Sequence, residues 1–168
     1  HNTYKNSLGE WVYPDDVKFD NSKLIQISKQ LEVTEGPIES MSKSKKNVID
    51  PQSIIANYGA DSARWFMLSD SPPERDINWS DSGIQGSWKF CQKIWTLLTE
   101  NKHIFEKNHR ICEYSGETKN FMGQVHEQLY EITQSIEKFQ MNVAVAKIYE
   151  MVNVINKFKS DYEDKEEA

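Results

Sequence analysis

Residues 84–98 read IQGSWKFCQKIWTLL, and large apolar side chains recur within them at regular steps. Along this stretch Ile84, Trp88, Cys91, Trp95 and Leu98 follow one another at alternating steps of four and three. Because an α-helix turns once every 3.6 residues, this spacing places all five on one helical face. The stretch therefore predicts an amphipathic helix whose apolar stripe is buried in a core.

Two further segments downstream repeat the pattern. The stripe of the second comprises Met122, Val125, Leu129, Ile132, Ile136 and Phe139, and that of the third comprises Met141, Val145, Ile148, Val152 and Ile155. Short links between such helices are typical of an up-and-down bundle. The third segment carries further apolar side chains outside its stripe, namely Val143, Met151, Val154 and Phe158. We expect this wide face to meet more helices, so that the chain ends inside a truncated bundle.

Upstream of the helices, residues 1–35 are typical of short strands joined by turns. Strands are predicted at 10–13, 23–27 and 30–34, between turn-forming residues such as Gly9 and Pro14. They are too few to close a sandwich by themselves, so they favour a small module at the edge of something larger. The predicted fold class is α+β, mostly α.

Between the strands and the helices, residues 40–47 read SMSKSKKN. Small residues let the backbone approach a ligand, hydroxyl and backbone N–H groups donate to phosphate oxygens, and Lys supplies a mobile positive charge. The loop therefore suits a polyphosphate, although it lacks the glycine pattern of a Walker loop. Asp50 and Pro51 then predict the start of a short helix that ends at Gly59, and Asp61 begins a second.

Composition sets limits on function. The net charge is −6, which argues against a generally basic nucleic-acid binder, yet residues 86–110 hold five Lys or Arg against two Glu. The two cysteines, Cys91 and Cys112, lack zinc-ligand spacing, so we expect thiols of a reducing compartment and no zinc site. No apolar run approaches the roughly 20 residues of a membrane span.

Several separated motifs resemble class I aminoacyl-tRNA synthetases. The run Met41-Ser42-Lys43-Ser44 is similar to their KMSKS signature, and residues 45–51 and 58–64 resemble the segments after that signature in the Leu, Ile, Val and Met subgroup. Residues 69–76, 79 and 82–86 are most similar to leucyl enzymes of the bacterial type, and residues 139–144 resemble the start of a later helix of the anticodon-binding domain. The resemblance extends from about Glu39 to Phe158. It departs from the signature at the first position, where Ser40 replaces the usual Lys.

The resemblance implies a leucine–tRNA ligase, which activates leucine with ATP and Mg²⁺ and transfers it to tRNA(Leu). It implies that Met41, Ser42, Lys43 and Ser44 bind ATP, and that Lys43 is catalytic because it neutralises charge on the departing pyrophosphate. We expect Met41 to anchor the loop by packing and the two Ser to shape it. Lys45 and Lys46 are expected to be solvated, with assistance to Lys43 as the alternative. Candidate tRNA contacts are Arg64, Lys89 and Lys93, although a salt bridge between the two short helices is an equal alternative for Arg64.

The resemblance also divides the chain. Residues 1–38 would be a β-containing insertion or an edge of the catalytic domain, 39–82 the loop and stem-contact helices, and 83–168 the start of the anticodon-binding helical domain. The amino-acid pocket and any editing site would lie outside, so the segment alone is expected to be inactive. The parent enzyme is expected to be cytoplasmic and monomeric. A valyl, isoleucyl or methionyl enzyme, a freestanding tRNA-binding helical module and a protein-interaction surface remain as alternatives.

Overall fold

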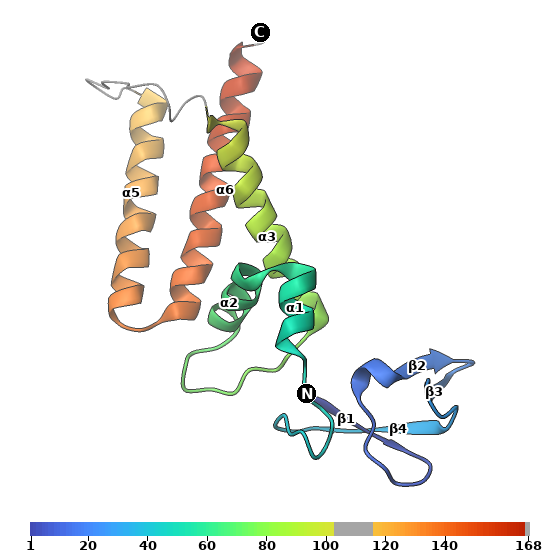
Figure 1. Cartoon of the computed structure of the whole chain (residues 1–168). Helices are drawn as coiled ribbons and strands as arrows, with labels where there is room; N and C mark the ends of the chain where they lie inside the picture. Colours follow the sequence, from blue (N-terminus) through green and yellow to red (C-terminus); the bar gives the residue numbers. More distant parts are fainter. Residues whose placement is uncertain (103–115, 167–168) are drawn as a thin grey trace. The chain divides into compact units, whose positions relative to one another are not determined.

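The computed structural model describes residues 1–102 and 116–166, which form two compact units, His1–Asn57 and Tyr58–Ala168 (Figure 1). Among the described residues are one four-stranded antiparallel sheet and five α-helices. The predicted class, α+β and mostly α, is confirmed.

The first unit is built on the sheet. Its strands are β1 (Asn2–Asn6), β2 (Val17–Asp20), β3 (Lys23–Gln26) and β4 (Glu32–Ile38), in the order β1-β4-β3-β2. The long strand β4 pairs with β1 on one side and β3 on the other, and all neighbours are antiparallel. The C-terminal end of β4 therefore lies beside the N-terminal end of β1, where Asn2 is paired with Ile38.

The sequence patterns found two of the four strands. The predicted strand at 23–27 corresponds to β3, and the one at 30–34 overlaps β4. The prediction at 10–13 is wrong, because only Trp11 forms an isolated bridge, to Lys5, before a short 3-10 helix over Pro14–Asp16. Strands β1 and β2 were missed because β1 consists largely of polar residues and β2 exposes most of its side chains, so neither shows clear alternation.

A chain of polar side chains holds the turns of this unit against the sheet. Buried Gln26 donates from Nε2 to Oδ2 of Asp16 at 2.8 Å and accepts at Oε1 from Asn6 at 3.0 Å. The Asp16 carboxylate also accepts from the backbone N–H and the hydroxyl of Ser28, at 2.8 and 2.6 Å. These bonds, that of the Ser28 hydroxyl above all, lower the pKa of Asp16 below its ordinary value of 3.8.

We expect Ser28→Ala to raise the pKa of Asp16 toward that ordinary value, because the substitution removes the hydroxyl donor. A lowered folded pKa means that this carboxylate stabilises the fold above about pH 4, and that the contribution is lost as pH falls through the folded pKa. An NMR titration of the Asp16 carboxyl group checks the shift. Ser53→Ala, made elsewhere in the same unit, is the control, and equal titrations in wild type and Ser28→Ala would refute the assignment.

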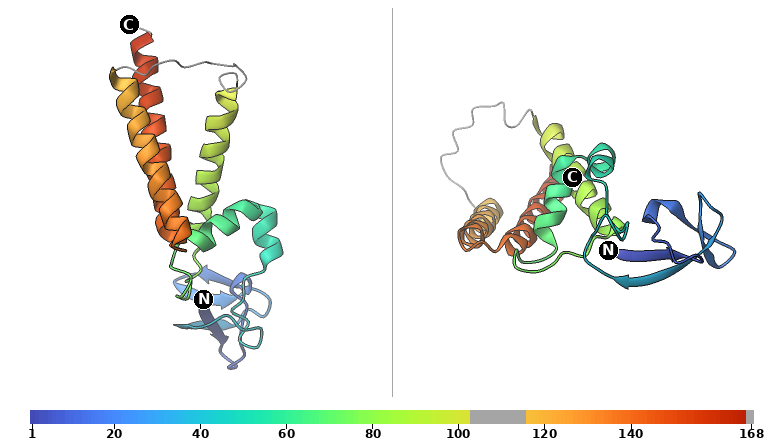
Figure 2. Two further views of the ribbon diagram at one scale, coloured as in Figure 1. Left: turned by 90° about the vertical axis from the view of Figure 1, so that its left-hand side faces the viewer. Right: turned by 60° about the horizontal axis from the view of Figure 1, so that its bottom comes forward.

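The second unit consists of helices. They are α2 (Ala60–Ser69), α3 (Asp81–Glu100), α5 (Gly116–Glu137) and α6 (Met141–Glu166). Helices α5 and α6 run antiparallel and side by side, and α2 contacts both α3 and α6 (Figure 2). These bounds confirm the predicted long helices and their up-and-down course.

An aromatic cluster joins three of these helices. Phe90 of α3 lies between Trp65 of α2 and Tyr149 of α6, with ring centroids 5.2 and 3.8 Å away. The indole N–H of Trp65 also donates to the Tyr149 hydroxyl at 3.1 Å, so the polar ends of both rings have partners. The three rings contact one another, so this cluster joins α2, α3 and α6 directly.

The predicted apolar stripes are confirmed in part. On α6, Val145 and Val152 are buried as predicted. On α3, the buried residues are Ile84, Ser87 and Phe90, whereas Trp88, Trp95 and Leu98 are exposed. On α5, Ile132 is buried, but Leu129 and Ile136 are exposed, and Phe139 is exposed in the turn after the helix. The stripe of α3 is rotated because the face that meets α2 determines what is buried.

The start of α3 lies close to the ring of Phe66 on α2. The Ser80 hydroxyl accepts from the backbone N–H of Gly83 at 3.1 Å and so caps the helix. A Cβ on Gly83 would lie 2.5 Å from the ring of Phe66 and 2.7 Å from the Ser80 hydroxyl. Position 83 therefore has room only for glycine.

We expect Gly83→Ala to destabilise the chain by about 1–3 kcal/mol, the usual cost of overpacking. Gly86→Ala is the matched control on the same helix, because nothing lies within 4 Å of a Cβ there. It should stabilise the chain by about 0.4–1 kcal/mol, since alanine restricts the unfolded chain. Urea unfolding measures both, and equal effects of the two substitutions would contradict this description of the helix start.

Some sequence expectations fall on residues that the structure does not describe. Cys112, Lys107 and Arg110 lie outside the described ranges, whereas Cys91 on α3 is a free, half-buried thiol. Within residues 1–102 and 116–166, no helix is long and apolar enough to cross a membrane.

Candidate functional site

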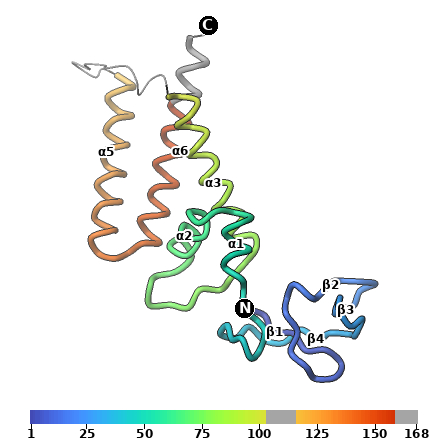
Figure 3. The backbone as a smooth tube through the Cα atoms, viewed as in Figure 1, coloured from blue at the N-terminus to red at the C-terminus, as the bar shows by residue number. Residues whose placement is uncertain are grey.

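The Ser/Lys-rich loop leaves the end of β4 and leads into α1, Pro51–Tyr58 (Figure 3). It closes on itself as a tight turn. The backbone N–H of Lys45 donates to the Ser42 carbonyl at 3.2 Å, and that of Lys46 donates to the Lys43 carbonyl at 3.3 Å. Lys46 has a φ of 54°, a left-handed conformation uncommon for a residue with a side chain. The loop is therefore an ordered turn.

Asn47 is the buried centre of this loop, with only 1% of its surface exposed. Its Oδ1 accepts from the backbone N–H of Ser42 at 2.8 Å. Its Nδ2 lies 3.2–3.3 Å from the carbonyl oxygens of His1, Glu39 and Ser40. Because the backbone N–H can only donate and the carbonyl oxygens can only accept, these partners fix the orientation of the amide.

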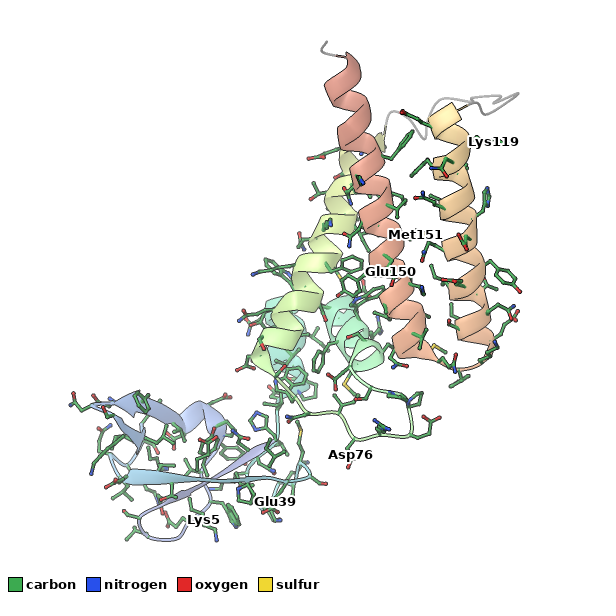
Figure 4. All side chains as sticks on the ribbon, turned by 180° about the vertical axis from the view of Figure 1, so that it is seen from behind. Lys5, Glu39, Asp76, Lys119, Glu150 and Met151 are labelled. Carbon is green, nitrogen blue, oxygen red and sulfur yellow. The ribbon has the colours of Figure 1, made fainter. Side chains whose placement is uncertain are left out.

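Two of the three loop lysines are held by the unit itself. Lys45 forms an ion pair with Glu39, the residue labelled in Figure 4 next to the end of β4. The Nζ of Lys46 lies over the ring of Tyr13, 5.4 Å from its centroid. The prediction that both are solvated is therefore wrong. The sequence does not show the contact of Lys46 with Tyr13, since these residues are 33 positions apart and only the fold brings them together.

The predicted ATP-binding residues lie together on the turn. Lys43 is exposed, and of the three loop lysines it alone has no ion-pair or ring partner among the described residues. The Ser42 and Ser44 hydroxyls lie 2.8 Å apart and so hydrogen-bond to each other, as expected of residues that shape the loop. Met41 is 43% exposed, so the packing role predicted for it is wrong, and buried Asn47 anchors the loop instead.

The start of α1 is formed as the sequence predicts. The carboxylate oxygens of Asp50 accept from the backbone N–H groups of Gln52 and Ser53 at 3.1 and 3.3 Å, and Pro51 is the first helical residue. This cap holds the C-terminal side of the loop. Gly59, with a φ of 83°, then separates α1 from α2.

The three residues predicted to contact tRNA lie on helices of the second unit. Arg64 forms an exposed ion pair with Asp61 of its own helix at 3.0 Å, so the alternative of a bridge between the two short helices is wrong. Lys89 and Lys93 are exposed one turn apart on α3, and Lys93 donates to Asn153 at 3.1 Å. Exposed i,i+3 ion pairs contribute little to stability, so Arg64 can exchange partners readily.

The chemistry available on the loop is that of an anion-binding turn. A mobile ammonium and paired hydroxyls are arranged on an ordered backbone, which suits the oxygens of a polyphosphate. Within the described residues, no group of three His, Cys, Asp or Glu side chains could hold a metal ion.

The comparisons with known proteins agree with this chemistry. The family model for class I tRNA synthetases (I, L, M and V) matches residues 32–80, which contain the whole loop. A leucine–tRNA ligase of Afipia carboxidovorans is 41% identical over 167 residues, covering 96% of this chain and 19% of the relative. One of Bartonella bacilliformis is 43% identical over 159 residues, covering 92% of this chain and 18% of the relative.

A solved structure is also similar. It is the ternary complex of Agrobacterium radiobacter K84 agnB2 LeuRS with tRNA and LeuAMS, which is 27% identical, with a TM-score of 0.63 over 72% of this chain and 16% of that one. The chain spans about a fifth of the length of the curated relatives it matches. Over that span, the chain belongs to the leucine–tRNA ligase family of class I aminoacyl-tRNA synthetases.

Proposed function

We propose that the whole protein is a leucine–tRNA ligase and that this chain supplies its pyrophosphate-stabilising loop and part of its tRNA-binding helices. The observation that carries the proposal is the ordered turn, in a segment about 40% identical to leucine–tRNA ligases. On this turn Lys43 is exposed, with no ion-pair or ring partner among the described residues. Leucine, ATP and tRNA(Leu) are then the substrates, and Mg²⁺ arrives with the nucleotide as part of the substrate.

The reaction has two steps. A carboxylate oxygen of leucine attacks the α-phosphorus of ATP, the bond to the β-phosphate breaks, and pyrophosphate leaves as leucyl-adenylate forms. A ribose hydroxyl at the end of tRNA then attacks the activated carbonyl carbon, and AMP leaves. In the first step, negative charge grows on the leaving pyrophosphate, and a positioned ammonium stabilises that charge in the transition state.

Each loop residue has a part in this proposal. Lys43 places its ammonium on the β- and γ-phosphate oxygens, and Ser42 and Ser44 offer hydroxyl donors once their mutual hydrogen bond opens. Met41, exposed beside them, lies against the nucleotide. Ser40 brings no charge to the loop entrance, so the electrostatic contribution falls to Lys43.

Helices of the second unit would contact tRNA(Leu) through its phosphates. Lys89 and Lys93 expose two cations one turn apart on α3, and Arg64 is exposed on α2. Such contacts add affinity without reading the nucleotide sequence, and they weaken as the salt concentration rises.

We place the whole protein in the cytoplasm as a monomer.

The test is tRNA charging by the whole protein with labelled leucine, isoleucine, valine or methionine. Attachment of leucine far above the other three is expected. A pocket distinguishes one methylene by only about 1–3 kcal/mol, so some charging with a close analogue is compatible with the proposal. Preferred charging with valine, isoleucine or methionine would instead assign the protein to a sister family.

A further inference from the structure

Asn47 is built into the loop in a way that the proposed role of Lys43 does not account for. It is the most deeply buried side chain of the loop, at 1% exposure, and one of the few fully buried side chains among the described residues. A buried amide is costly unless its polar atoms find partners, and here both ends of the amide have them. These partners are all backbone groups, so the side chain fixes the path of the backbone.

The bonds of Asn47 close the loop at both ends. The bond to the Ser42 N–H joins the last residue of the turn to its first. The contacts with the carbonyl oxygens of Glu39 and Ser40 tie that closed turn to the residues that directly follow β4. The contact with His1 ties it to the residue that precedes β1, the strand paired with β4. The Cα of Lys43, inside the turn, is thereby placed relative to the sheet.

The other two lysines hold the same turn from outside. Lys45 is paired with Glu39, and Lys46 lies over Tyr13. With its neighbours engaged in this way, the loop presents Lys43 alone as a mobile charge. The position from which Lys43 can reach a phosphate is therefore set by the hydrogen bonds of Asn47, together with the contacts of Lys45 and Lys46.

We propose that Asn47 is a positioning residue that acts through Lys43, by closing residues 42–47 onto the sheet so that the Lys43 ammonium meets the leaving pyrophosphate. This inference rests on the proposed function of the loop. Asn47 touches no substrate in this role. A misplacement of a catalytic group by about 1 Å can lower the rate by up to about 100-fold. Loss of the Asn47 hydrogen bonds should therefore slow leucine activation without weakening leucine binding.

The test uses the whole protein and the substitution Asn47→Asp. Aspartate keeps the shape and the acceptor for the Ser42 N–H, but it removes the N–H donors and sets a carboxylate oxygen against three carbonyl oxygens. Asn47→Ala is assayed beside it, because alanine removes the same donors without adding a charge. Asn6→Asp is the matched control: Asn6 is also buried and multiply hydrogen-bonded in the same unit, but it lies at the end of β1 and its side-chain partners are outside the loop.

Each substitution is introduced into the wild-type protein and into the Lys43→Ala variant. The rate of leucine-dependent ATP–pyrophosphate exchange is then measured below the melting temperature of every variant. Asn47→Asp and Asn47→Ala should lower kcat by about 10- to 100-fold in wild type, with the KM for leucine unchanged. In the Lys43→Ala background the same substitutions should lower kcat by less than about 2-fold, because the ammonium that Asn47 positions is absent. Transfer of leucine from preformed leucyl-adenylate to tRNA should persist, which shows that the variants are folded.

Two results would overturn the inference. One is a reduction of kcat by the same factor in both backgrounds, since a residue that only supports the fold acts independently of Lys43. The other is a loss no larger than that caused by Asn6→Asp. If wild type shows no leucine-dependent exchange, the proposed function itself fails. If wild type is active and Lys43→Ala is not, but neither Asn47 substitution matters, only the role of Asn47 fails.

Discussion

Lys43→Ala in the whole protein should slow formation of leucyl-adenylate by about 100- to 1000-fold, equivalent to about 2.7–4 kcal/mol of transition-state stabilisation. The reason is that Lys43 is the loop lysine without an ion-pair or ring partner among the described residues, so its ammonium is available for the pyrophosphate. Single-turnover formation of the adenylate measures the chemical step directly. The KM for leucine should change little, because the side chain acts on the leaving group.

Lys18→Ala is the control for this substitution. Lys18 lies in the same unit and is exposed, but it pairs with Asp20 on β2 at 3.5 Å, away from the loop. Its removal should leave the rate within about 2-fold, as expected for a surface ion pair. Near-normal adenylate formation by Lys43→Ala, or an equal loss in both variants, would rule out the proposed role of Lys43.

Phe90→Ala should destabilise the helical unit by about 3–5 kcal/mol, the range for removing a buried aromatic ring. Phe90 is 6% exposed and lies between Trp65 and Tyr149, so the substitution leaves a cavity at the point where α2, α3 and α6 meet. Urea unfolding of the chain, followed by far-UV circular dichroism, gives the free energy of unfolding.

Trp95→Ala is the matched control on the same helix. It removes a larger side chain, but Trp95 is 68% exposed, so the expected change is within about 0.5 kcal/mol. A stability loss for Trp95→Ala that equals the loss for Phe90→Ala would mean that the core of this unit is not where the aromatic cluster places it.

These two positions also show where sequence patterns reach their limit. The pattern in residues 84–98 predicts the helix correctly, yet it assigns Trp88 and Trp95 to the core and overlooks Ser87. Periodicity shows that a helix has an apolar side, but the buried face is set by the neighbours that pack on it. Here the neighbouring α2 and α6 meet the Phe90 side, so the buried face is rotated from the predicted one.

The loop shows the same limit on a smaller scale. Its residue types predict an anion-binding turn, and Asp50 with Pro51 predicts the cap of α1, because both inferences depend on neighbouring residues only. Residue types could not show that Asn47 is buried or that Lys46 lies over Tyr13, since those contacts depend on how the sheet folds back. An asparagine at the end of a Ser/Lys-rich turn was the one available signal, as its amide can donate and accept at once.

The most direct test of the proposed function is ATP–pyrophosphate exchange by the whole protein, with leucine, isoleucine, valine and methionine supplied one at a time. Exchange requires reversible formation of the aminoacyl-adenylate, so it reports the step that the loop is proposed to assist. We predict exchange that is fastest with leucine and that collapses in Lys43→Ala. Exchange led by another amino acid, or no exchange with any of the four, would contradict the proposal.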